Sequence, residues 1–367
     1  MHKVIKQLII FVAITTVVFV AANIVTYRAL VSVFRIGDIQ IKHSIAYAFM
    51  FLSGGFIVML FIEKKVSHVL VRILYTVTAV WTGVFVYLFF AAVLFDFSKR
   101  MFFDARVFGV FFFFVAIALG IYGVVHAKKI FIKKIQVSLP NLPVVWRGRT
   151  AVWVSDLHLG SIYQASFAKK VTDTINSVSP DIIFVGGDLY DGTHAPDPYA
   201  IAQPLQNLSS KLGTFYITGN HEEFGSAELF LDAIKKLGMN ILQDEKIEID
   251  GLQIVGVDYA HSAQKENFKT VLDSIDIDVS KPSILLKHEP RDLETAEQAG
   301  ISLQISGHTH RGQQWPFNFL AQYVYKGYDY GLKNHGTMNV LVSSGVGGWG
   351  PPLRIGTDGE IVHITFI

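Results

Sequence analysis

Clusters of Asp, Asn and His recur along the C-terminal two thirds of this 367-residue chain, and these residue types can hold metal ions. The clusters are Asp156-Leu157-His158, Gly187-Asp188, Gly219-Asn220-His221-Glu222, His288 and Gly307-His308-Thr309-His310. Carboxylate oxygens, amide oxygens and imidazole nitrogens are ligands that Mn, Fe, Zn or Mg accept. Two such ions close together can activate a water and stabilise both the attacking and the leaving oxygen of a phosphoryl transfer. The sequence therefore predicts a two-metal site.

Each cluster directly follows a short apolar run of the kind that forms a buried strand. The runs are 150–155, 182–186, 214–218, 284–287 and 302–306. In open α/β sheets, ligands bind beyond the carboxyl ends of the strands, which is where the clusters fall. A lone His or Asp at such a place is most often a surface residue or a helix cap. The prediction therefore rests on the joint occurrence of the clusters.

The rest of the C-terminal region favours an α/β architecture that could position these clusters. Further strands are predicted at 130–137, 253–257 and 339–343, because these are short apolar runs bounded by turn residues. Helices are predicted at 165–178 and 226–237. Strands that alternate with helices favour a sheet packed between helices.

The first 127 residues have a different composition, with four long spans that contain no Asp, Glu, Lys or Arg. The spans are 7–27, 44–62, 73–95 and 107–125, with 21, 19, 23 and 19 residues. Because a helix needs about 20 apolar residues to cross the hydrocarbon core, we predict four transmembrane helices. A cleaved signal peptide is a weaker interpretation of the first span, and buried helices of a soluble protein are a weaker interpretation of all four. The predicted domains are a four-helix transmembrane region at 1–127 and a second domain at 128–367.

The charges that flank these spans predict the side of the membrane on which the second domain lies. An even number of crossings places both ends of the helical region on one side, with nine Lys or Arg residues there and six opposite. The nine are Lys3, Lys6, Lys64, Lys65, Arg72, Lys128, Lys129, Lys133 and Lys134, and the six are Arg28, Arg35, Lys42, Lys99, Arg100 and Arg106. Since cytoplasmic flanks carry the positive excess, we predict a multi-pass protein of the cell membrane with a cytoplasmic catalytic domain.

Composition excludes several classes of function. The chain has no Cys, so disulfides, zinc–thiolate sites and thiol catalysis are excluded. The formal net charge of +2 is far from the basic excess of a nucleic-acid binder, so no nucleic acid is expected as a partner. The predicted helices lack intramembrane charges, which usually mark ion or substrate paths, so a transporter or channel is disfavoured.

The order of the clusters resembles the motif series of the calcineurin-like metallophosphoesterases, D-x-H, G-D, G-N-H-E/D, H and G-H-x-H. The segments Ser343-Ser344-Gly345 and Gly350-Pro351-Pro352-Leu353-Arg354 resemble the bacterial membrane-associated branch of that family. That branch includes YkuE-like phosphoesterases and some UDP-2,3-diacylglucosamine hydrolases. The resemblance covers about residues 130–367 and implies an α/β domain built as a two-sheet αββα sandwich.

The resemblance also implies a role for each clustered residue. A first metal would be held by Asp156, His158 and His310, a second by Asn220, His288 and His308, and Asp188 would bridge both. His221 would not bind metal but would act as the catalytic acid that assists the leaving oxygen. The implied cofactors are two divalent metal ions, with Mn as the first expectation and Fe, Zn, Co or Ni as alternatives.

Four further side chains near the motifs are candidates for a role in the site, and three of them have two interpretations. Lys287 could attract an anionic substrate, or it could point into solvent. Arg311 could bind a phosphate through two hydrogen bonds, or it could lie on the surface. Trp349 could line the same cleft. Glu222 could orient His221, or it could be an ordinary exposed or capping residue.

The segment 315–330 directly follows the last metal motif and is rich in large apolar side chains. Nine of them are Trp, Phe, Tyr, Leu or Val, and aromatic residues of this kind favour the membrane–water interface. One interpretation is a lip that docks on the bilayer or receives an acyl chain. The other is an ordinary hydrophobic flap packed on the sheet.

Together these observations predict a membrane-anchored two-metal phosphohydrolase that cleaves a phosphodiester or pyrophosphate bond. The expected partners are the lipid bilayer and a phosphorylated small molecule or lipid, such as a lipid-linked or nucleotide-sugar lipid substrate. One alternative is a phosphomonoesterase or phosphoprotein phosphatase. Another is a sensor that binds metal without turnover.

Overall fold

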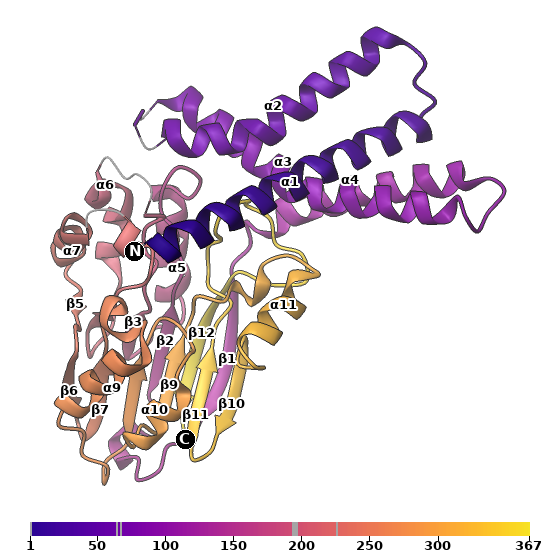
Figure 1. Cartoon of the computed structure of the whole chain (residues 1–367). Helices are drawn as coiled ribbons and strands as arrows, with labels where there is room; N and C mark the ends of the chain where they lie inside the picture. Colours follow the sequence, from indigo (N-terminus) through magenta and orange to yellow (C-terminus); the bar gives the residue numbers. More distant parts are fainter. Residues whose placement is uncertain (1, 64, 67, 193–196, 225–226) are drawn as a thin grey trace. The chain divides into compact units, whose positions relative to one another are not determined.

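The computed structural model describes residues 2–63, 65–66, 68–192, 197–224 and 227–367, and it contains two compact units (Figure 1). The helical unit comprises residues 1–62 and 69–124. The sandwich unit comprises residues 63–68 and 125–367.

Four helices form the helical unit, and each is long and apolar enough to cross a membrane. They are α1 (His2–Val33), α2 (Ile39–Glu63), α3 (Val69–Ser98) and α4 (Ala105–His126). Each predicted span lies inside one of them, so the four-helix prediction is confirmed. In α3 44% of the most apolar window is buried, the largest share of the four, so this helix is the most enclosed.

Polar side chains link three of these helices inside the apolar unit. The Ser53 hydroxyl on α2 donates to Asn23 Oδ1 on α1 at 2.7 Å, and Trp81 Nε1 on α3 donates to Ser53 Oγ at 2.9 Å. Hydrogen bonds of this kind, together with close packing, are what associates helices in an apolar medium.

The sandwich unit contains two six-stranded sheets (Figure 1). The first has the order β1 (Phe131–Val137), β12 (Glu360–Phe366), β2 (Thr150–Val154), β3 (Ile182–Val185), β4 (Thr214–Tyr216), β5 (Asn240–Ile241). The second has the order β10 (Gly331–His335), β11 (Met338–Val342), β9 (Leu303–Ser306), β8 (Ser283–Leu286), β7 (Leu252–Gly256), β6 (Glu245–Ile249). The strands from β2 to β5 run parallel, as do β7, β8, β9 and β11. The carboxyl ends of the parallel strands therefore gather at one edge of each sheet.

Helices and short 3₁₀ turns connect the strands. The helices are α5 (Ala165–Asn176), α6 (Pro198–Ala202), α7 (Ala227–Lys236), α8 (Tyr259–Ser262), α9 (Lys265–Ser274), α10 (Leu293–Gln298) and α11 (Phe317–Val324). The 3₁₀ turns are η1 (Val144–Trp146), η2 (Gln203–Asn207), η3 (Glu222–Phe224) and η4 (His310–Gly312).

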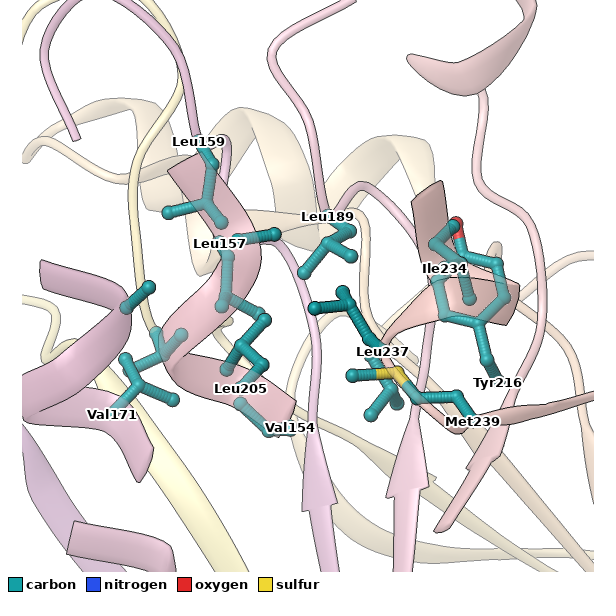
Figure 2. Close-up of a cluster of buried hydrophobic side chains, with 14 of the residues drawn as sticks. Val154, Leu157, Leu159, Val171, Leu189, Leu205, Tyr216, Ile234, Leu237 and Met239 are labelled. Carbon is teal, nitrogen blue, oxygen red and sulfur yellow. The ribbon is translucent and has the colours of Figure 1, made fainter. Parts of the chain in front are cut away.

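Three hydrophobic cores hold the layers together. One lies between the two sheets, one packs the first sheet against α5 and α7, and one packs the second sheet against α9 and α10. Figure 2 shows part of the second of these cores, including Val154, Leu189 and Ile234. Each large apolar side chain that is fully buried contributes about 1.5–3 kcal/mol. The predicted two-sheet α/β architecture is confirmed.

Strand β2 shows how the sequence builds these layers. Because successive strand residues point to opposite faces, Ala151 and Trp153 face the core between the sheets, while Val152 and Val154 face the helices. All four side chains are buried, which explains why this strand is a continuous apolar run.

The eight predicted strands are present, with ends that differ by at most two residues from those predicted. The predicted helices correspond to α5 and α7, although residue 226 lies outside the described residues. Sequence patterns missed four strands, which are β5, β6, β10 and β12.

Candidate metal centre

The loops that follow five parallel strands carry the predicted ligands. Those after β2, β3 and β4 come from the first sheet, and those after β8 and β9 come from the second. Both sheets therefore contribute side chains to the same region of the sandwich unit.

The backbone at these positions is unusual. A positive φ is rare for residues other than glycine, and such conformations cluster at functional sites. Five predicted ligands adopt it, namely Asp156, His158, Asp188, His308 and His310, with φ between 47° and 67°. The surrounding structure imposes this conformation, and it turns these side chains away from the strand direction.

A first group of ligand atoms comes from Asp156, His158 and His310. The Nε2 atoms of His158 and His310 lie 3.1 Å apart, and His310 Nε2 lies 3.6 Å from Asp156 Oδ1. The backbone N–H of His308 donates to Asp156 Oδ1 at 3.0 Å, which fixes the carboxylate. All three ligand residues are buried or nearly so.

A second group comes from Asp188, His288 and His308. His288 Nε2 lies 3.2 Å from His308 Nδ1 and 3.2 Å from Asp188 Oδ2. The other ring nitrogen of His288 is 2.7 Å from the carbonyl of Gly186, and a carbonyl can only accept. Nδ1 therefore carries the hydrogen, and Nε2 is directed at the centre, as is usual for a metal-binding imidazole.

Asp188 connects the two groups. Its Oδ2 atom is 3.2 Å from His288 Nε2 in the second group and 3.8 Å from His158 Nε2 in the first. Its Oδ1 atom accepts the backbone N–H of His221 at 2.9 Å. This position suits the bridging role that the family resemblance implies for it.

The atoms of the centre fit divalent metal ions. Two nitrogens bound about 2.0–2.1 Å from one ion lie roughly 3.0–3.4 Å apart, which matches both His–His pairs. Asn220 Oδ1 is buried and has no hydrogen-bond partner among the described residues. A buried amide oxygen in that condition costs free energy unless it finds a ligand. Cation binding would satisfy both the facing nitrogens and this oxygen.

Burial sets the charge of three of the four candidate nitrogen ligands. It lowers the pKa of His158 to about 3 and that of His308 to about 3, and it lowers the pKa of His310 well below its usual value. These three imidazoles are therefore neutral near pH 7, with lone pairs to offer. Neutral nitrogens and ionised carboxylates are the protonation states that metal binding requires.

The two acidic ligands differ in their pKa values. Burial raises the pKa of the Asp156 carboxyl to about 6. Burial acts in the same direction on Asp188, but His288 and the other imidazoles outweigh it and hold the pKa well below its usual range. Burial would also lower the pKa of His288, but Asp188 and Asp156 raise it to about 10. The carboxyl group between the two groups is therefore the more readily ionised of the two.

His221 lies beside the centre. It belongs neither to the first group, with Asp156, nor to the second group, with Asp188. Its Nδ1 donates to the carbonyl of Asp191 at 2.8 Å, and its ring is 4.6 Å from that of His158, edge to face. The bond to a carbonyl places the hydrogen of the neutral ring on Nδ1. Nε2 is then the atom that can exchange a proton with a substrate.

Asp191 is a site residue that the sequence interpretation missed. Its Oδ1 is 3.6 Å from His158 Nδ1 and 3.8 Å from His221 Nδ1. Burial raises its pKa well above the usual value. Its place three residues after Asp188, in the same loop, is the signal that could have found it. It stands behind two imidazoles and can fix the orientation of both.

Glu222 is completely buried, so the interpretation as an exposed residue is wrong. Its Oε2 accepts the backbone N–H groups of Asp188 and Gly219, and its Oε1 accepts those of Leu189 and Tyr190. Burial and Asp188 raise its pKa to about 7, while the N–H groups act in the opposite direction. The carboxylate joins the loops after β3 and β4, and its four bonds are to backbone groups rather than to the His221 ring.

Lys287 is also buried, so a solvent-facing lysine is the wrong interpretation. Its Nζ donates to the carbonyl of Glu289 at 3.0 Å and lies 5.0 Å from the centre of the Phe268 ring. Burial lowers its pKa to about 8. The structure thus places its ammonium against α9, and contact with a substrate stays a prediction.

Trp349 and Arg311 lie nearer to the centre. The Trp349 ring is 59% exposed and stands 6.2 Å from the ring of His221. Gln313 holds its backbone from both sides, at 3.0 Å to the N–H and 3.1 Å to the carbonyl. The Arg311 guanidinium lies over the Tyr330 ring at 4.3 Å. The substrate roles of both residues stay predictions.

A buried arginine supports the loop that carries Trp349. Arg354 donates five hydrogen bonds, all to backbone carbonyls, including those of Ser344, Gly345 and Gly347. Gly345 has a φ of 70°, and a Cβ there would come within 2.7 Å of the Asp156 side chain. The loop therefore packs directly on a predicted ligand, and its position depends on Arg354.

Comparison with known families identifies the same region. Residues 150–312 match the family model described as calcineurin-like phosphoesterase. This range contains all seven predicted metal ligands together with His221 and Asp191.

Several bacterial proteins are similar to the chain. An uncharacterized metallophosphoesterase of Helicobacter pylori is 35% identical over 220 residues, which cover 59% of this chain and 59% of that protein. One from Aquifex aeolicus is 31% identical over 261 residues, which cover 69% of this chain and 97% of that protein. YkuE of Bacillus subtilis, another uncharacterized metallophosphoesterase, is 29% identical over 245 residues, which cover 61% and 81%. The chain thus spans about three fifths of the length of its Helicobacter relative.

Proposed function

The chain belongs to the calcineurin-like metallophosphoesterase family, and from this membership we propose that it is a two-metal hydrolase held at a membrane. The family agrees with the resemblance found in the motifs, including that to YkuE. The proposed reaction is hydrolysis of a phosphodiester or pyrophosphate bond. The observation that carries the proposal is the pair of Asp and His groups joined through Asp188.

The proposed ligand sets follow the two groups. Asp156, His158 and His310 form the first, Asn220, His288 and His308 form the second, and Asp188 belongs to both. Two divalent ions held there would supply Lewis-acid stabilisation of phosphoryl charge and activate a water for attack. Oxygen and neutral nitrogen donors suit Mn, Fe, Zn, Co and Ni alike, so availability decides between them.

His221 is the proposed proton donor to the leaving oxygen. Its Nδ1–H bond to the Asp191 carbonyl fixes the ring, so that Nε2 can give up a proton only from the imidazolium form. The Asp191 carboxyl group lies 3.8 Å from the same ring nitrogen and helps to hold the ring in this position. The residue therefore needs no metal bond to take part in the reaction.

Trp349 is the proposed wall of the substrate site. Its exposed ring stands beside His221, where the leaving group would depart. A flat apolar side chain there can cover the leaving group and keep bulk water from the proton transfer. The two hydrogen bonds with the Gln313 side chain fix the Trp349 backbone and leave the Trp349 ring accessible.

We infer a lipid-linked or nucleotide-sugar lipid substrate from the helical unit. Four helices of membrane-spanning length tether the sandwich unit, so membrane substrates meet the centre at high local concentration. The excess of Lys and Arg on the side that carries the sandwich unit supports a cytoplasmic location.

The test uses the purified full chain loaded with Mn and three substrates. These are an aryl phosphodiester, the matching monoester and a lipid-linked nucleotide pyrophosphate, each assayed beside Asp188→Ala. We expect the lipid pyrophosphate to be cleaved faster than the other two substrates. In Asp188→Ala, both this activity and the bound metal should be lost.

Two other outcomes would contradict parts of the proposal. Preference for the monoester would indicate a phosphatase instead. Turnover of none of the three, with both metals bound by elemental analysis, would indicate a metal-binding sensor.

A further inference from the structure

Helix α11 and the tryptophan before it expose a nearly continuous apolar surface. We call this surface the aromatic face, and it consists of Trp315, Phe317, Phe319, Leu320, Tyr323 and Val324. Their exposed fractions run from 40% for Phe317 to 83% for Tyr323. Of the eight residues of α11, only Ala321 is buried. The interpretation as a flap packed on the sheet is therefore wrong.

The aromatic face is nonetheless firmly attached at both ends. The Trp315 backbone N–H donates to the carbonyl of Ile355 at 2.8 Å. After the helix, the carbonyl of Asp329 accepts the hydroxyl of Thr309 at 2.7 Å. Thr309 lies between the predicted ligands His308 and His310. These two hydrogen bonds fix both ends of the segment. The exposed apolar side chains therefore belong to an anchored part of the chain.

Tyr325, which caps α11, connects the aromatic face to the metal centre. Its ring is 6.3 Å from the ring of His308, edge to face, and its hydroxyl donates to Glu289 Oε1 at 3.4 Å. Whatever binds the aromatic face is therefore held one side chain away from a predicted ligand.

Basic residues flank the same end of the helix. Lys326 directly follows Tyr325 and is exposed, and the Arg291 guanidinium lies 5.6 Å from the centre of the Tyr325 ring. Both line a cavity of about 440 Å³ together with Lys265 and the acidic Asp292 and Glu294, and Arg291 Nε pairs with Glu289 Oε1 at 2.6 Å. An apolar helix face beside Lys and Arg is the composition of helices that lie in the interface of anionic membranes.

The chain itself indicates which surface would cover this face. Four helices of membrane-spanning length precede the sandwich unit, and the last ends at His126, only four residues before β1 begins at Phe131. Four extended residues span roughly 13–14 Å, so a bilayer crossed by α4 is within reach of the sandwich unit. Trp and Tyr are the side chains that concentrate at that interface.

We propose that the aromatic face docks on the bilayer surface, with Lys326 directed at anionic head groups. This contact would be separate from the transmembrane tether. It would hold the metal centre beside the membrane so that a membrane-borne substrate reaches it, a consequence that rests on the proposed function.

The absence of Cys from the chain makes a clean test possible. Tyr323→Cys is labelled with an environment-sensitive fluorophore in the full chain, reconstituted in vesicles of phosphatidylcholine and phosphatidylglycerol. The matched control is Val279→Cys, because Val279 is 74% exposed and precedes β8, at the end of that strand opposite His288. Quenching is read with lipids that carry a nitroxide near the head group, since an interfacial helix lies about 5–10 Å deep.

The expected result is a shift to shorter emission wavelength and strong quenching at position 323, with neither at position 279. Equal responses at the two positions would overturn the proposal. A wavelength shift at position 323 that grows with protein density, without quenching by the labelled lipids, would overturn it in favour of a second copy of the chain.

A second variant separates docking from hydrolysis. Phe319→Ser combined with Leu320→Ser should abolish the quenching at position 323 and slow cleavage of a vesicle-embedded lipid pyrophosphate. The rate on a soluble aryl phosphodiester should stay unchanged. If the unmodified chain cleaves neither substrate but position 323 is quenched, the proposed function fails and docking stands. If the double variant cleaves both substrates as fast as the unmodified chain does, docking does not help the membrane-borne substrate reach the metal centre.

Discussion

The buried carboxylate of Glu222 permits a prediction that depends on backbone bonds alone. In Glu222→Gln the side chain keeps its size, but one oxygen becomes an NH₂ group. Each oxygen accepts two backbone N–H groups, so the two that donate to the replaced oxygen would face another donor. Because the four N–H groups belong to Asp188, Gly219 and the two residues after Asp188, the loops after β3 and β4 lose their common partner.

The expected loss follows from the number of bonds. Above pH 7 the Glu222 carboxyl, whose pKa is about 7, is mostly ionised. A hydrogen bond to a charged group contributes about 1.5–3 kcal/mol, so removing two should then destabilise this region by about 3–6 kcal/mol. That is a large part of the 5–15 kcal/mol that typically stabilises a whole domain. At about 1.4 kcal/mol per factor of ten, local opening should become roughly 10²–10⁴ times more frequent.

Amide hydrogen exchange followed by mass spectrometry measures this opening directly. Peptides that cover residues 187–191 and 217–221 should lose protection in Glu222→Gln, and metal content should fall because Asp188 is no longer held. Glu223→Gln is the matched control, since Glu223 is the next residue in the chain but is exposed. Unchanged protection of both peptides in Glu222→Gln would refute the role we assign to its four bonds.

Three further substitutions test neighbouring parts of the site. His221→Ala should lower turnover by about 10²–10⁴ with both metals retained, and full activity would remove His221 from the mechanism. Asp191→Asn preserves the backbone carbonyl but weakens the hold on two imidazoles, so metal affinity or turnover should fall by about 10–100-fold, measured by metal titration and kinetics. Arg354→Lys cannot reproduce five hydrogen bonds from one planar group, so the thermal unfolding midpoint of the full chain should fall, and an unchanged midpoint would contradict the support we assign to Arg354.

Most of the strands that were predictable from sequence are buried on both faces. Strand β3 is Ile-Ile-Phe-Val, and all four side chains are buried, so its apolar run is unambiguous. Two of the missed strands lack this signal. Strand β6 at Glu245–Ile249 alternates charged and apolar residues at a sheet edge, and β10 at Gly331–His335 is mostly polar for the same reason. Their partners across the sheet, rather than their own composition, determine that they form strands.

Sequence reasoning located the candidate ligands better than the residues that support them. Ligand types at strand ends form a pattern that is visible in one dimension, as for Asp188 and His288. Glu222 binds backbone N–H groups that include one 34 residues away, and Arg354 binds carbonyls 4 to 10 residues away. Any residue can supply a carbonyl or an N–H. Because the partner contributes only a backbone group, its side chain does not mark the contact in the sequence. Such residues can be recognised only when the fold brings the loops together.

The distribution of ligands over the two sheets has a thermodynamic consequence. Asp156, His158 and Asp188 come from the first sheet, whereas His288 and His310 come from the second. The facing imidazoles of His158 and His310 can bind one ion only while the core between the sheets is intact. Metal binding therefore favours the closed sandwich over any state in which the sheets separate, and the free energy of binding adds to that of folding. The same coupling explains how five strained backbone conformations persist at the centre, since the packed sheets, and not local preferences, hold them in place.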